Sequence, residues 1–187
     1  TIAGGGGLIT VPALLLTGMP PAAALGTNKL QACFGSGTAT TRFLISKDLH
    51  IKELWFGFIF CAIGAVAGTL CIESLHPTLL KHILPYLLII CLLYTLFKPK
   101  LLQLQKHVTI PHPTFLITFG LLLGFYDGFL GPGTGSFWVV AFCLFQGWDM
   151  QQATIHTKFY NFISNVASLI IFATAGHVVM AYGLVMA

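Results

Sequence analysis

The sequence FYDGFLGPGTG, residues 125–135, interrupts a chain that is otherwise strongly apolar. Four glycines, one proline and Asp127 fall within this stretch, and apolar segments flank it on both sides. Glycine and proline free the backbone N–H and C=O groups of a helix, and a membrane tolerates such groups only where they face protein or a water-filled cavity. The stretch therefore predicts a membrane helix that is broken at a functional site.

The composition predicts a membrane protein. Of the 187 residues, 56% are hydrophobic and only 7% are charged, whereas about 25% of the residues of a soluble domain are charged. Apolar runs of about 20 residues, the length of a membrane-spanning helix, recur along the chain. We therefore expect an all-α, polytopic membrane protein whose surroundings are a lipid bilayer.

The composition also argues against other classes of protein. The net charge of +4 is not gathered in a run of lysines and arginines, so we expect no nucleic acid partner. The five cysteines lie in apolar segments without C-x-x-C spacing, and the histidines lack the spacing of metal ligands. We therefore predict neither a metal site nor a cofactor.

The placement of positive charge predicts the orientation in the membrane. Two plain apolar spans, 54–75 and 79–97, separate two polar segments, 46–53 and 98–113, and both polar segments carry lysines. The positive-inside rule places both segments on the cytoplasmic side. Two crossings between them satisfy this placement, which predicts a multi-pass protein; the location in the inner (plasma) membrane is what the family resemblance described below implies.

The chain repeats its order of features when it is shifted by 129 residues. Gly6 then falls on Gly135 and Lys29 falls on Lys158. Each copy has a glycine run, a short apolar piece and a longer helix that carries polar side chains. Internal repeats of this kind are typical of secondary transporters.

The two copies are predicted to have opposite orientations. The segment 46–53 carries lysines, whereas its counterpart 175–182 carries neither lysine nor arginine, so the two segments belong on opposite sides of the membrane. We predict a first repeat that is truncated at its N-terminus, a cytoplasmic linker, and a second repeat that is truncated at its C-terminus, over residues 1–97, 98–113 and 114–187.

A short helix follows each glycine run. The N-terminus of a helix offers unpaired N–H groups and the positive end of its dipole, which suits an anion. Because two such breaks occupy matching positions, we expect two half-helices to meet at the middle of the membrane around an anionic substrate. The alternative is that the small residues serve only close helix packing.

Lys29 and Lys158 lie in matching motifs, GTNK and IHTK. A lysine inside a membrane is costly and usually faces a cavity or a partner, so we expect both to attract the anion; the alternative is that they snorkel to the interface. Asp127 would cap a half-helix, pair with one of these lysines, or carry a coupling proton.

The candidate substrate-binding residues share a place in the two breaks or a polar side chain on the helices that follow. Their partner would be a small anion, with a proton or a sodium ion as the coupling ion. No catalytic residue is predicted, and the histidine among the candidates would sense pH or simply form a hydrogen bond. The candidates are Gly5, Gly6, Gly7, Thr27, Asn28, Lys29, Gln31, Asp127, Gly133, Thr134, Gly135, Ser136, His156, Thr157, Lys158, Asn161 and Asn165.

The motifs AGGGGLITVPALL with ALGTNKLQ, and GFYDGFLGPGTGSF with ATIHTKFYNFISN, resemble the two repeat signatures of the TauE/SafE family of sulfite and organosulfonate exporters, and most closely its YfcA-like branch. The resemblance covers nearly the whole chain. It implies two inverted repeats with a central site at the glycine runs and the two lysines. It also implies export of small sulfur-containing oxyanions such as sulfite or organosulfonates. In the family an aspartate usually precedes the first glycine run, and that position lies before Thr1.

Three functional hypotheses follow from these features. The first is a secondary transporter of a small sulfur-containing oxyanion, and a carboxylate transporter is a variant of it. The second is an anion channel that uses the same lysines. The third, an integral membrane enzyme that uses Asp127 and His156 as acid and base, lacks a nucleophile, a metal set and a cofactor motif, so we predict that the protein is not an enzyme.

Overall fold

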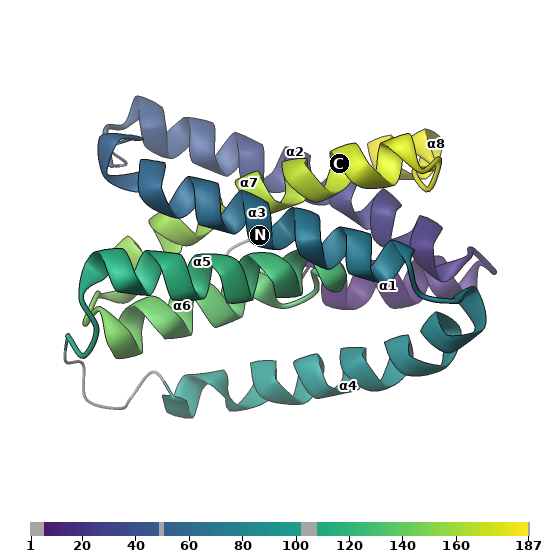
Figure 1. The fold of residues 1–187 in the computed structure, drawn as a ribbon, viewed down its shortest axis with the longest axis horizontal. Coiled ribbons are helices and arrows are strands. Elements are labelled where there is room, and N and C mark those ends of the chain that lie inside the picture. Colours follow the sequence, from purple (N-terminus) through teal and green to yellow (C-terminus); the bar gives the residue numbers. More distant parts are fainter. Residues whose placement is uncertain (1–5, 49–50, 102–107, 187) are drawn as a thin grey trace.

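The computed structural model describes residues 6–48, 51–101 and 108–186, and within these ranges the chain forms helices and no β-strand. The helices are α1 (Gly6–Leu16), α2 (Pro21–Ile45), α3 (Ile51–Glu73), α4 (Pro77–Leu101), α5 (His112–Phe129), α6 (Thr134–Phe145), α7 (Met150–Thr174) and α8 (Met180–Val185). They lie roughly along one common axis (Figure 1).

Apolar side chains cover much of the exterior, and polar side chains lie inside. In α3 and α4 the exposed side chains include Trp55, Phe56, Ile63, Tyr86 and Ile90, with exposed fractions of 52–70%. Within the described residues, two helical segments are long and apolar enough to cross a membrane, Leu54–Glu73 and Pro77–Tyr94. This distribution suits a lipid surround and confirms the predicted all-α, polytopic membrane protein.

The half-helices α1 and α6 begin near the middle of the molecule and run outward to opposite ends (Figure 1). Each leads into a helix of 25 residues, α2 or α7, and these two long helices pack against each other in opposite directions (Figure 1). The element order and its reversal confirm two inverted copies with broken half-helices. The sequence limits assigned to the repeats and to the linker stay a prediction.

Helices α5 and α6 form a re-entrant hairpin. Helix α5 runs inward from one end of the molecule, the chain turns at residues 130–133, and α6 returns to the same end (Figure 1). The helix ends that flank the lysine-bearing segments 46–53 and 98–113 also lie at this end (Figure 1). We call it the basic end, and its cytoplasmic placement stays a prediction.

Helices α3 and α5 approach closely because glycines line both sides of their contact. A Cβ atom added to Gly64 or Gly68 of α3 would lie 2.4 or 2.1 Å from a carbonyl oxygen of α5. One added to Gly124 or Gly128 of α5 would lie 2.4 or 2.0 Å from a carbonyl oxygen of α3. Small residues permit such packing in membranes, and this contact fixes the helix that ends at the break.

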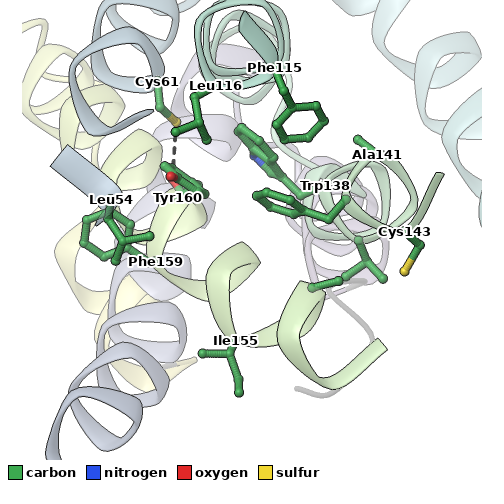
Figure 2. Close-up of a cluster of buried hydrophobic side chains, with 13 residues drawn as sticks. Leu54, Cys61, Phe115, Leu116, Trp138, Ala141, Cys143, Ile155, Phe159 and Tyr160 are labelled. Atoms are coloured by element: carbon green, nitrogen blue, oxygen red, sulfur yellow. Dashed lines mark hydrogen bonds between the residues drawn. The ribbon is translucent and has the colours of Figure 1, made fainter. Parts of the chain in front are cut away.

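An aromatic cluster joins α5, α6 and α7 on the side of the basic end (Figure 2). The Trp138 ring stacks on Tyr160 at 4.8 Å and on Phe142 at 5.4 Å between centroids. The Cys61 thiol contacts the backbone oxygen of Tyr160 (Figure 2). The cluster holds α6 against α7, and thereby fixes the half-helix whose first turn borders the site described below.

Replacement of Gly128 by alanine tests the close contact. The added methyl group would meet the carbonyl oxygen of Ala65, so we expect the free energy of unfolding in detergent to fall by about 1–3 kcal/mol. Gly35→Ala is the matched control, since nothing lies within 4 Å of its added Cβ and alanine favours the helix. Equal unfolding temperatures for the two variants would contradict the close packing of α3 on α5.

Candidate functional site

A buried ion pair lies at the centre of the fold. The Lys29 ammonium on α2 lies 2.9 Å from the Oδ1 atom of Asp127 at the end of α5, and both side chains are almost completely buried. Lys29 also donates to the backbone oxygen of Asp127 and to the Oδ1 atom of Asn165, the latter at 3.1 Å. The lysine therefore neutralises the carboxylate and also donates to the backbone at the end of α5.

Hydroxyl groups satisfy the rest of the Asp127 carboxylate. Thr134, the first residue of α6, donates to its Oδ1 atom at 2.9 Å, and Ser164 of α7 donates to its Oδ2 atom. A buried charge is tolerated where it is paired and hydrogen-bonded. This set of contacts joins α2, α5, α6 and α7 at the predicted break.

The local sequence explains the shape of the break. Gly131 and Gly133 adopt φ values of +90° and +86° on either side of Pro132, a backbone conformation that glycine adopts without steric cost. A Cβ atom on Gly131 would also lie 2.9 Å from the Lys29 ammonium nitrogen. Glycine at 131 therefore permits both the turn and the ion pair.

The two glycine breaks meet. A Cβ atom on Gly7, in the first turn of α1, would lie 3.3 Å from the Cα atom of Pro132 and 3.1 Å from the side-chain nitrogen of Asn28. Asn28 in turn accepts a hydrogen bond of 2.6 Å from Thr10. The start of α1 is thus held against the turn that precedes α6.

A cavity of about 190 Å³ lies beside this junction. Its wall combines the first turns of α1 and α6 with one face of α2 and one face of α7. The lining residues are Gly6, Gly7, Asn28, Gln31, Ala32, Gly35, Ser36, Asp127, Gly131, Thr134, Gly135, Lys158, Asn161, Asn165 and Met186. We call this space the central cavity.

The first turn of α6 borders the central cavity through Thr134 and Gly135. Its N-cap is Gly133, which has no side chain to accept from them. The Thr134 and Ser136 N–H groups bond to carbonyl oxygens of the preceding turn at 3.3 and 2.8 Å. The N–H group between them belongs to Gly135, which lines the central cavity. A helix start without a side-chain cap offers donors to an anion.

Two further polar side chains of α7 complete the wall. Lys158 lines the central cavity and is largely buried, with 9% of its surface exposed. The Oδ1 atom of Asn161 is buried without a hydrogen-bond partner among the described residues. Buried polar atoms are rarely left unsatisfied, so this atom marks the wall as one that a polar ligand or water would complete.

Several predicted residues lie outside the cavity lining. Lys29 contacts Asp127 and Asn165 and does not line the cavity. Lys158, at the matching position of the second repeat, does line it. Thr27 accepts from the Val179 N–H group at 3.0 Å, and His156 bonds to the backbone oxygen of Gln152 at 2.9 Å and lies beside Trp148. Also outside the lining are Gly133, Ser136 and the buried Thr157. Gly5 lies outside the described residues.

The candidates from the sequence did not include Ala32, Gly35, Ser36, Gly131 and Met186, which also line the cavity; Gly131 lies within the predicted break. The three residues of α2 continue the face that begins with Asn28 and Gln31, at helical spacing. The helical periodicity of this face is the sequence signal by which the three α2 residues can be identified. Met186 has no comparable signal, because its position depends on how the segment after α7 folds back.

Away from the basic end, the segment that follows α7 packs against α2 and α3. A Cβ atom on Gly26 would lie 2.2 Å from the backbone oxygen of His177. The His177 ring also lies 2.8 Å from the carboxylate of Glu73 on α3. These contacts hold the segment between α7 and α8 against α2 and α3.

No group of three or more metal-ligating His, Cys, Asp or Glu side chains occurs in the described part of the chain. The site consists of amides, hydroxyls, backbone donors, one ion pair and Lys158. Such a set can bind and orient a small charged molecule.

The buried ion pair predicts strong coupling between its two members. Removal of one partner leaves an uncompensated buried charge, which costs about 3–5 kcal/mol. We therefore expect Lys29→Met and Asp127→Asn each to lower the free energy of unfolding in mixed micelles by this amount. The double variant has no net buried charge, so it should lose less than the sum of the two, by about 1–3 kcal/mol. Additive losses would contradict the pair.

Comparisons with known proteins agree with this architecture. The family model described as "Sulfite exporter TauE/SafE" matches residues 1–187. A "Probable membrane transporter protein" of Haemophilus influenzae is 44% identical over 99% of this chain and 72% of its own length. "Probable membrane transporter protein ORF9" of Sinorhizobium sp. is 44% identical over 100% and 71%, and "Probable membrane transporter protein YfcA" of Escherichia coli K12 is 41% identical over 100% and 69%. No solved structure matches.

Proposed function

Because the chain belongs to the sulfite exporter TauE/SafE family and its relatives are named probable membrane transporters, we propose that it is a secondary transporter of small sulfur-containing oxyanions. Sulfite and short organosulfonates are the proposed substrates, export is the proposed direction, and the inner (plasma) membrane is the proposed location. These names indicate a transporter and not an enzyme.

The observation that carries the proposal is the composition of the central cavity wall. A cationic side chain, Lys158, and the starts of two half-helices, at Gly6–Gly7 and at Thr134–Gly135, border one cavity, and the start of α6 has no side-chain cap. Each of these features favours negative charge. An oxyanion has several acceptor oxygens, so it can accept from backbone N–H groups and from the ammonium at the same time.

The pairing of Asp127 with Lys29 makes the cavity compatible with an anionic substrate. Its carboxylate borders the same cavity, where it would repel an anion if it were not paired. Lys29 cancels this charge at 2.9 Å. The ion pair thus lets a carboxylate hold the break together while the cavity beside it accepts an anion.

The inverted architecture supports transport by alternating access. The bound anion would lie between half-helices that belong to opposite copies, so a movement of one copy against the other changes the side from which the site is reached. On the side away from the basic end, Gly26 of α2 and Glu73 of α3 contact His177 in this structure.

Replacement of Lys158 by glutamine tests the proposed site. A charge-assisted hydrogen bond contributes about 1.5–3 kcal/mol, so we expect the affinity for sulfite or ethanesulfonate to fall about tenfold to a hundredfold. Uptake of the radiolabelled anion into proteoliposomes and ligand-induced thermal stabilisation would measure the change. Lys158→Arg, which keeps the charge, should retain part of the affinity.

Lys81→Gln is the matched control for this experiment, because Lys81 is an exposed lysine of α4 away from the central cavity. We expect it to transport as the unchanged protein does. Normal transport by Lys158→Gln would contradict the anion site. Failure of the unchanged protein to bind either sulfite or ethanesulfonate would contradict the proposed substrate class.

A further inference from the structure

A second, larger cavity lies between α2 and α7 toward the basic end. Its volume is about 670 Å³, and its lining residues are Gly35, Thr38, Ala39, Arg42, Phe43, Ser46, Asp48, Thr154 and Lys158. We call it the α2–α7 groove. Gly35 and Lys158 line both the groove and the central cavity, so the two spaces adjoin at these residues.

Polar side chains of α2 and α7 form part of the groove lining, beside apolar ones. Thr38 lies near the middle of the wall and uses its hydroxyl to bond to the Phe34 oxygen at 2.8 Å. Thr154 bonds in the same way to the Met150 oxygen at 2.6 Å. Hydroxyls whose donors are satisfied within their own helix still present acceptor oxygens to water. The groove is therefore suited to hold water.

The charges of the groove favour an anion. Arg42 lies in the last turn of α2, where it is exposed, and Lys158 lies at the inner end of the groove. The carboxylate in the lining is that of Asp48 at the outer rim, and it accepts a hydrogen bond of 2.5 Å from Ser46. Two cations and one anion leave a positive balance. Between low-dielectric walls, such a balance attracts anions and raises their rate of arrival.

We propose that the α2–α7 groove is the path by which the anion passes between the basic end and the central cavity, with Arg42 as its outer cation and Lys158 as its inner one. This inference rests on the proposed function and extends it to a residue, Arg42, that lies outside the central cavity. On the opposite side, His177 packs against Gly26 and Glu73, and the proposed path leads from the basic end. Arg42 acts on the rate of arrival and does not touch the bound anion.

Reaction of introduced cysteines with small charged thiol reagents tests the path without any assumption about the substrate. Thr38 and Thr41 form a matched pair, because both are exposed threonines of α2 that bond to the oxygen four residues earlier. Only Thr38 of the two lines the groove, and Thr41 lies nearer to the end of the helix. With the accessible Cys33 and Cys71 replaced by alanine, Thr38→Cys and Thr41→Cys would each be labelled with anionic sulfonatoethyl methanethiosulfonate and with its cationic trimethylammonium-ethyl analogue.

We expect Thr38→Cys to react faster than Thr41→Cys although it lies deeper, since thiols react as thiolates in water. We also expect the anionic reagent to be favoured at Thr38→Cys. The ratio of the anionic to the cationic reaction rate should be higher at this cysteine than for a small thiol free in solution. Arg42→Gln should reduce that preference about threefold to tenfold at low salt, with a smaller effect at high salt. Asp48→Asn should increase it.

Lys47→Gln is the control for Arg42→Gln, because Lys47 is an exposed cation at the same end that does not line the groove. It should leave the preference unchanged. A slower reaction at Thr38→Cys than at Thr41→Cys would overturn the path, and an unchanged preference in Arg42→Gln would overturn the role of Arg42. Labelling requires no transport, so these outcomes test the path alone. The proposed function has a separate test, and normal transport by Lys158→Gln would overturn it.

Discussion

The contact between Lys29 and Asp127 is the constraint on which the rest of the structure depends. A broken helix inside a membrane leaves backbone groups that lipid cannot satisfy. Here Lys29 donates to one of them, the backbone oxygen of Asp127. It binds the last turn of α5 through both the carboxylate and the backbone oxygen of Asp127. Thr134 and Ser164 then attach the start of α6 and the middle of α7 to the same carboxylate.

The two lysines, which occupy matching positions in the sequence, have different surroundings in the structure. The repeat places Lys29 and Lys158 in matching positions, yet only Lys158 lines the central cavity. Lys29 contacts Asp127 at the end of α5, whereas Lys158 lies on the wall of the cavity. Lys29 therefore stabilises the second break, and Lys158 contributes a positive charge to the cavity wall. The ion pair keeps a carboxylate beside an anion site without repulsion.

The sequence predicts the fold well because the strongest signals are local. Apolar runs, glycine breaks and the placement of lysines predict the helices, the half-helices and their reversal. Helix α1 begins at Gly6 and α6 at Thr134, both within the predicted breaks. The site is predicted less well because it depends on which face of a helix turns inward. Thr27 and His156 are polar and close to the lysines in sequence, but their partners are Val179 and Gln152. Gly35 and Ser36 become visible only through the face that they share with Gln31, and Met186 depends on the turn after α7.

The account makes one central claim: a small oxyanion binds where the starts of α1 and α6 meet, beside Lys158. The most direct measurement is a crystal structure with bromomethanesulfonate, whose bromine gives an anomalous signal. The account predicts one strong peak in the central cavity, with the sulfonate within hydrogen-bonding distance of the Gly135 N–H group and the Lys158 ammonium. A peak at another place in the protein, or an empty central cavity at a saturating concentration, would contradict it.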